Sequence, residues 1–351
     1  MSKSGNKNLV CEWQESKWRP DRCPEEPEDT ETGNEFNQIL ACSCSLDGQR
    51  FITAGTDTNI RVYEISTRNL VGNCQSSYLQ ERMDGHVRRI TALKYHPRGV
   101  ASQFYAHLFI SGSWDDSIQI WDDRYVHSLW QYFGPHICGN DALDIEPEAN
   151  HIITSSWRRE NSILQVWLFN EDALMNFFET GTKEPIRGSL SPAICRRNSD
   201  QHLMPLAEIA QNQFESPTSG YVARWLGTKF MLYGGSDENI LKIIDKSTLN
   251  VSFSSVHLSI LIITHAFVHV SYERSGRRER FSQVVRKLES VNFFGRFGFH
   301  TTTIASLSKF SRGVISTAFT LPQATEAKQT IRLAIASGCK VYIAVLDCSF
   351  S

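Results

Sequence analysis

The chain has 351 residues, 41% of them hydrophobic and 11% aromatic, which is enough apolar material for one large or two ordinary globular domains. Its 36 basic and 38 acidic residues give a formal net charge of −2, which argues against a dedicated nucleic-acid binder. The nine cysteines are scattered without a CxxC pair, and the first residues contain no apolar signal-peptide core. We therefore expect a reduced protein of the cytoplasm, the nucleus or both.

Residues 1–35 consist of two unlike pieces. Leu9–Trp13 is short and apolar, whereas Pro20–Glu35 is acidic and rich in proline. The acidic piece contains too little apolar surface to fold alone, so we expect it to be an exposed linker.

Residues 36–250 contain a recurring pattern of short alternating runs separated by polar turns. Its clearest example is Phe109–Arg124 (FISGSWDDSIQIWDDR), in which two runs of period 2 flank the turn Trp114–Asp116. This pattern predicts a β-hairpin, and the Asp115 carboxylate can accept hydrogen bonds from turn amides. Similar closing strands are expected to begin at Ile60, Ile118, Leu164, Leu241 and Lys340.

Three of these units have an acidic residue at the same place in the turn. Asp57 precedes Tyr63 by the same six positions that separate Asp115 from Trp121. The third unit has lost this acid, and the fourth keeps it as Asp237. The last unit, within residues 313–351, has a very short turn at Gly338–Cys339.

Residues 251–312 fit the pattern poorly. Val256–Val270 is strongly apolar but shorter than the roughly 20 residues of a transmembrane helix, so buried strands are expected and no membrane span is predicted. Phe281–Val291 has apolar residues at helical spacing. We interpret this region as an insertion or a degenerate repeat.

The second unit joins Gly85-His86 to a hairpin that closes on Trp121-Asp122, and this combination resembles a blade of the WD-repeat family. The resemblance implies an all-β WD-repeat β-propeller. A blade needs roughly 40–45 residues, so the wide gaps leave room for two degenerate blades and give seven in total. The domains are then 1–35, with Leu9–Trp13 as the outer closing strand before an acidic linker, 36–250 as blades, 251–312 as the atypical region and 313–351 as the final blade.

The same resemblance implies that His86, Asp115, Ser111 and Trp121 form a hydrogen-bonded chain, with Asp57 and Asp237 as the structural turn acids of their own blades. A histidine beside an aspartate also fits a catalytic base. We favour the structural role because no nucleophile belongs to the set and a buried indole N–H needs an acceptor.

Phe109–Arg124 also resembles the sixteen-residue box of WD-repeat substrate receptors of cullin-RING ubiquitin ligases. This likeness implies that Asp115, Asp122 and above all Arg124 contact the linker protein of the ligase. A surface arginine offers a planar donor fork suited to such a contact. The neighbouring blades end in Tyr63-Glu64-Ile65-Ser66 and Trp167-Leu168-Phe169-Asn170, without this arginine.

Three further groups are weaker candidates. His257, His265 and His269 lack a fourth ligand for a tetrahedral metal site. The positive charge of Arg274–Arg280 is offset by neighbouring acidic residues, so we expect a solvated loop there. Arg158-Arg159 is expected to project from one rim of the third blade. We therefore expect no cofactor, no direct contact with nucleic acid and no enzymatic activity. The leading hypothesis is a protein-interaction scaffold for an intracellular complex, the alternative is a ubiquitin-ligase receptor, and a propeller enzyme is a remote third.

Overall fold

Five antiparallel sheets make up the described part of the computed structural model. The structure describes residues 14–16, 36–77, 83–158, 162–180, 205–209, 219–228, 230–236, 239, 241–246, 259–264, 287–291, 303–307, 310, 312–320 and 328–349.

The first two sheets are four-stranded meanders. They contain β1 (Ile39–Cys44), β2 (Arg50–Gly55), β3 (Ile60–Glu64), β4 (Leu70–Cys74), β5 (Ile90–Tyr95), β6 (Leu108–Ser113), β7 (Ser117–Asp122) and β8 (Trp130–Phe133). Both tight turns need a left-handed backbone, which Thr58 adopts at φ 66° and Asp116 at φ 61°. Aspartate tolerates this conformation better than most residues, in agreement with the predicted turn.

The remaining three sheets recruit strands from distant parts of the chain. The third contains β9 (Leu143–Ile145), β10 (His151–Ser155), β11 (Leu164–Leu168) and β12 (Ala207–Ile209). The fourth contains β13 (Ser219–Leu226), β14 (Phe230–Ser236), β15 (Leu241–Asp245) and β18 (Thr303–Leu307). The fifth contains β19 (Val314–Thr320), β20 (Lys328–Ser337), β21 (Lys340–Ser349), β16 (Ser259–Thr264) and β17 (Lys287–Val291).

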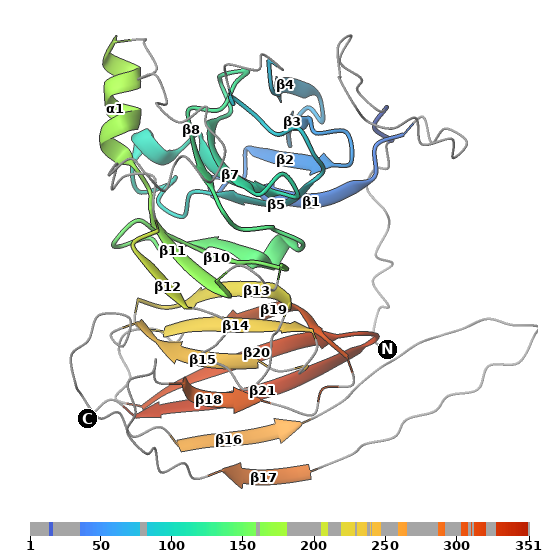
Figure 1. Ribbon diagram of the computed structural model, residues 1–351, viewed down its shortest axis with the longest axis vertical. Helices are drawn as coiled ribbons and strands as arrows, with labels where there is room; N and C mark the ends of the chain where they lie inside the picture. The colour runs from blue at the N-terminus through green and yellow to red at the C-terminus, as the bar shows by residue number, and fades with distance from the viewer. Residues whose placement is uncertain are drawn as a thin grey trace, which may run out of the picture.

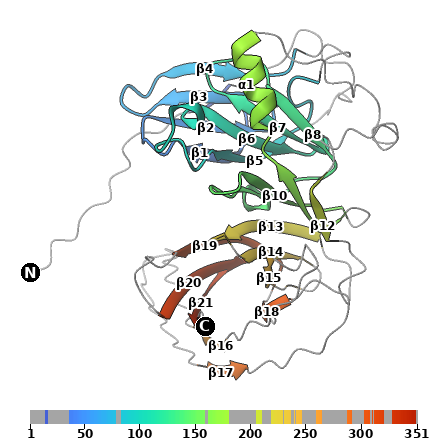
Figure 2. The ribbon, with the colours of Figure 1, turned by 90° about the vertical axis from the view of Figure 1, so that its left-hand side faces the viewer.

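The sheets follow one another as the blades of a β-propeller (Figures 1 and 2). The first strands of consecutive sheets touch, because β1 contacts β5, β5 contacts β9, β9 contacts β13 and β13 contacts β19. A short 3-10 helix, η2 (Asn140–Ala142), contacts β1, β5, β13 and β19. It therefore lies where the inner strands converge.

The described residues form five blades rather than the seven expected from chain length. The described strands in the two wide gaps join sheets of neighbouring units: β12 pairs with β11, β18 with β15, and β16 with β21. The strand β17 also replaces part of the expected helical pattern of Phe281–Val291, because it pairs with the apolar strand β16. The interpretation of residues 251–312 as an insertion or degenerate blade stays a prediction.

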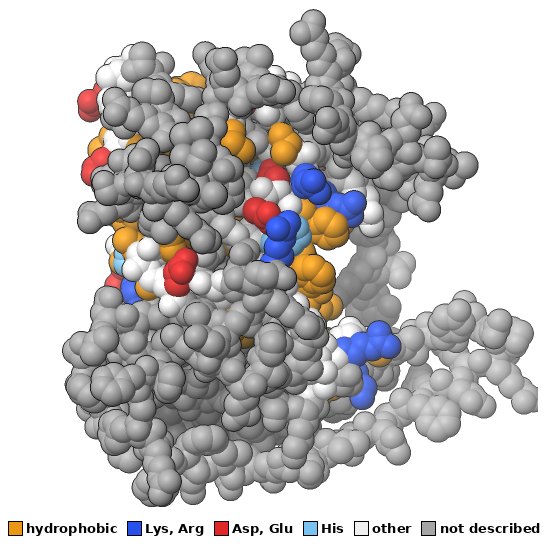
Figure 3. Space-filling view, in the orientation of Figure 1, with side chains coloured by type: hydrophobic (Ala, Val, Ile, Leu, Met, Phe, Trp, Pro, Cys, Tyr) orange, Lys and Arg blue, Asp and Glu red, His pale blue; other side chains and the backbone are white. Residues whose placement is uncertain are grey.

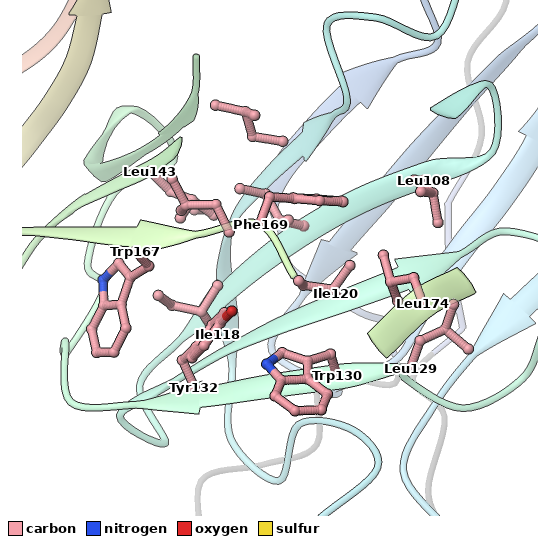
Figure 4. Packing of buried hydrophobic residues seen from close by; sticks show 14 of the residues in the cluster. Leu108, Ile118, Ile120, Leu129, Trp130, Tyr132, Leu143, Trp167, Phe169 and Leu174 are labelled. Atoms are coloured by element: carbon pink, nitrogen blue, oxygen red, sulfur yellow. The ribbon is translucent and has the colours of Figure 1, made fainter. Parts of the chain in front are cut away.

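The helix α1 (Glu171–Thr180) lies between β11 and β12 of the third blade and packs against the second blade. Its Leu174 is 1% exposed and belongs to the core cluster that joins the two blades. Figure 4 shows Leu174 among Leu129, Ile120 and Phe169. Every residue of β6 and β7 is buried, because neighbouring structure covers both faces of this hairpin. The blade with the clearest sequence pattern is thus also deeply enclosed.

Candidate partner-binding site

A continuous chain of hydrogen bonds crosses the second blade. His86 Nδ1 lies 2.9 Å from the Asp115 carboxylate and Nε2 lies 2.6 Å from the Ser111 hydroxyl. The Trp121 indole donates to that same hydroxyl at 2.7 Å. With the ring proton assigned to Nδ1, Nε2 accepts the Ser111 proton and each group has a partner.

Asp115 is committed to the blade by several donors. Its side chain is 8% exposed and also accepts hydrogen bonds from the Val87 amide and from the amide and hydroxyl of Ser117. Burial raises the pKa of Asp115, but the electrostatic interaction and hydrogen bond with His86, together with the other donors, outweigh it, so the pKa is lowered overall. The carboxylate is therefore held as an anion inside the fold.

The first blade forms a related network around Glu15, in the N-terminal segment. The Glu15 carboxylate accepts hydrogen bonds from the Thr53 hydroxyl at 2.5 Å and the Tyr63 hydroxyl at 2.9 Å. Arg61 joins Glu15, at 3.2 Å, to the turn acid Asp57, at 2.6 Å. Glu15 thus bonds both the strand hydroxyl and the closing aromatic residue of the first blade, two groups that in the second blade, as Ser111 and Trp121, bond each other directly.

Arg124 is the surface-facing member of the ubiquitin-ligase-like box. Its guanidinium donates two hydrogen bonds to Asp122, from Nε to Oδ1 at 2.8 Å and from Nη2 to Oδ2 at 2.6 Å. The Arg124 side chain is 51% exposed, whereas that of Asp122 is 0% exposed. Hydrogen bonding to Asp122 raises the pKa of Arg124 despite its partial burial. Asp122 therefore orients Arg124, and Arg124 alone of the two faces solvent.

The aromatic end of α1 lies beside Arg124. The guanidinium carbon is 5.9 Å from the centre of the Phe178 ring, and Tyr125 contacts Phe177 with ring centres 5.4 Å apart. Tyr125 and Val126 are 41% and 49% exposed. The sequence analysis did not predict this helix, although Leu174, Phe177 and Phe178 have the spacing of one helical face.

His107, Asp122 and Asp123 offer ligand atoms within 4.8 Å of one another, close enough to hold a metal ion. Their charges are already matched: Asp122 holds Arg124, and Asp123 binds His107 at 2.6 Å and Arg50 at 3.0 Å. A cation here would have to displace these partners, so the cluster fits an ion-pair network better than a metal centre.

A second charged cluster occupies the centre of the ring. Asp141, from η2, lies 3.2 Å from Arg224 and 3.8 Å from Lys94, and it accepts a hydrogen bond from the Thr317 amide at 2.9 Å. Burial, and then the charge of Arg224, lower the pKa of Lys94. Lys94, Arg224 and Thr317 come from the second, fourth and fifth blades, and Asp141 in η2 ties these blades together at their inner strands.

The other predicted residues are placed as follows. Arg158 lies in the turn of the third blade, 3.0 Å from Asp116 and with its side chain 46% exposed. Leu9–Trp13, Arg159, Asp237, the three histidines of the weak metal candidate and Arg274–Arg280 lie outside the described residues. Within the described residues, no helix is long and apolar enough to cross a membrane.

Comparison with known families finds the model described as "WD domain, G-beta repeat" at residues 26–64 and 76–122. The matched segments include β1–β3 and β5–β7, that is, the Glu15-anchored blade and the blade with the His86 network. No curated protein matches the chain.

Proposed function

Because this chain belongs to the WD-repeat family of β-propeller proteins, we propose that it is a non-catalytic scaffold that assembles an intracellular protein complex in the cytoplasm, the nucleus or both. The observation that carries this proposal is that His86 and Asp115 hydrogen-bond to other groups inside the fold. His86 is 0% exposed, and its two ring nitrogens bond Asp115 and Ser111. A general base must reach a proton on a bound substrate, and this buried ring does not.

The scaffold proposal also agrees with the form of the blades. Rigid sheets carry loops whose side chains are available on the rims, and such loops are the usual place for binding residues.

A second candidate function is that of a cullin-RING substrate receptor. Arg124 supports it, since its exposed guanidinium is pre-oriented by Asp122 and flanked by the exposed Tyr125 and Val126. Pre-orientation lowers the entropy lost when a partner's carboxylate or carbonyl is bound. The neighbouring blades lack the arginine, so any second contact would have to come from other residues of this face.

Affinity capture from cell lysate tests both functions. The parent chain is compared with three variants. Arg124→Ala removes the arginine, and Asp122→Asn removes the ion pair with Asp122 but keeps the arginine. The control is Arg332→Ala, at an exposed arginine of the fifth blade. Circular dichroism first establishes that all four chains fold alike.

The scaffold function predicts that the parent retains a reproducible set of proteins. The receptor function predicts in addition that the ligase linker protein is among them, is lost with Arg124→Ala, is reduced with Asp122→Asn and is kept with Arg332→Ala. If linker protein is absent from the parent sample, the receptor function is wrong. The scaffold function is then judged by whether the parent retains other proteins reproducibly.

A further inference from the structure

Aromatic and basic side chains gather on the rim formed by the turns of the second and third blades. The two turn tryptophans, Trp114 and Trp157, flank His136, with ring centres 5.6 Å and 6.1 Å from the imidazole. Arg89 lies over the Trp114 ring at 4.3 Å. The indole N–H of Trp157 donates to the Tyr221 hydroxyl at 3.0 Å, which extends the cluster to the fourth blade.

Backbone hydrogen bonds fix the loops that carry these side chains. The Trp114 amide donates to the Arg89 carbonyl at 3.2 Å, and the Trp157 amide donates to the His136 carbonyl at 2.9 Å. The Ser113 hydroxyl donates to the Arg89 carbonyl at 2.8 Å. The surface is thus pre-organised, and a partner that binds it would not need to order the loops.

The exposed parts of the cluster are the residue types that dominate binding energy at protein interfaces. Trp157 is 43% exposed. The Arg158 side chain is 46% exposed. Tryptophan and arginine are enriched among interface hot spots, because each combines a large contact area with fixed donors. Figure 3 shows basic, histidine and hydrophobic side chains gathered on the right-hand half of the face in view.

The charge of this surface is positive. Arg88 and Arg89 are exposed, and Arg158 adds a third guanidinium. Asp116 opposes them, but it is already shared by His136 at 2.7 Å and Arg158 at 3.0 Å. The Arg89 guanidinium is held over the Trp114 ring, and a guanidinium offers a fork of N–H donors that suits a carboxylate.

We propose that Arg88, Arg89, Trp157 and Arg158 form a docking site for an acidic protein segment that carries an apolar side chain among its carboxylates. The arginines bind the carboxylates, and Trp157 covers the apolar side chain. This inference rests on the scaffold function and names the chemistry of one partner. The docking site lies on the connections β4–β5 and β10–β11, whereas Arg124 lies in the connection β7–β8.

Fluorescence anisotropy with a labelled peptide of glutamates around a central phenylalanine tests this site. The controls are the same peptide with lysine in place of each glutamate and a single-stranded oligonucleotide. The full chain is compared with Trp157→Ala, Arg158→Glu and Arg332→Glu, which makes the same charge change on the fifth blade. Thermal melting confirms that each variant is folded.

The site predicts that the acidic peptide binds the parent, that the lysine peptide does not, and that Arg158→Glu and Trp157→Ala each weaken binding about tenfold or more. Arg332→Glu should bind within about twofold of the parent. The proposal is overturned if the acidic peptide fails to bind, if Arg332→Glu weakens it equally, or if the oligonucleotide binds more tightly and loses affinity with the same two variants.

The same two variants, used in affinity capture, separate this proposal from the scaffold function. Selective loss of some captured proteins supports the docking site. If all captured proteins are kept, the scaffold function holds and the docking site is wrong, and if the parent captures nothing, the scaffold function itself fails.

Discussion

The carboxylate of Glu15 accepts a hydrogen bond from the Thr53 hydroxyl at 2.5 Å, although the two residues lie 38 positions apart in the chain. Glu15 and its cationic partner Arg61 have side chains only 1% and 8% exposed. Glu15 therefore joins the described N-terminal residues 14–16 to the first blade.

Replacing Glu15 by alanine should destabilise the protein by about 3 kcal/mol, because it removes two hydroxyl partners and one of the two acids that neutralise buried Arg61. Denaturant unfolding measures this loss. Glu179→Ala, at an exposed acid of α1, serves as the control and should change stability by less than about 0.5 kcal/mol. Equal stability of the two variants would contradict the anchoring role.

Replacing Trp121 by alanine should cost about 3–5 kcal/mol through the cavity and the lost hydrogen bond. Trp121 is 0% exposed and its ring stacks on Phe109 with centres 6.2 Å apart. Trp157→Ala is a matched control, since the same side chain is 43% exposed there. The melting temperature of Trp121→Ala should be clearly lower than that of Trp157→Ala. Similar values would contradict the structural role of Trp121.

Replacing Ser111 by alanine removes one oxygen but leaves two buried groups without a partner, His86 Nε2 and the Trp121 indole. We expect a loss of roughly 2–4 kcal/mol, more than a single hydroxyl bond contributes. The variant Ser111→Thr keeps the hydroxyl and should recover part of the loss. Chemical unfolding of both variants tests this, and a Ser111→Ala change below about 0.5 kcal/mol would refute the shared role of the hydroxyl.

His96 makes stability depend on pH. Its ring is 1% exposed and stacks on Tyr105 at 4.1 Å, and burial followed by the charge of Arg98 lowers its pKa from 6.5 to about 3. Below about pH 6.5 the unfolded chain takes up a proton here that the folded chain does not, so stability falls as the pH falls.

Between about pH 6.5 and about pH 5 this group should remove about 2 kcal/mol of stability. The variant His96→Phe keeps the stacked ring but does not titrate. Its melting temperature should therefore fall less than that of the parent over this interval. Parallel curves for the two proteins would show that His96 is not the cause.

The local elements of the fold were predictable because they depend on neighbouring residues. Alternation around Trp114–Asp116 specified the β6–β7 hairpin, and the Gly338 turn, with φ 59°, connects β20 to β21 as expected. The number of blades was not predictable from chain length, since β12, β18 and β16 add to the third, fourth and fifth sheets and do not form sheets of their own.

The candidate site was predictable only in part, for the same physical reason. The sequence places Asp122 two residues before Arg124, so their pairing follows from local geometry. In contrast, Glu15 lies in a segment of ordinary polar composition, and Asp141 meets Thr317 across 176 positions. Such contacts depend on the closure of the whole ring, and neither periodicity nor turn chemistry carries that information.

The scaffold function is tested most directly by the size at which the full chain elutes when fresh lysate is fractionated by size exclusion at physiological salt. The account predicts that most of the chain elutes in a complex larger than the monomer and shifts to the monomer position when purified alone. If the chain elutes as a monomer in lysate, with and without mild cross-linking, it assembles no stable complex and the central claim is contradicted.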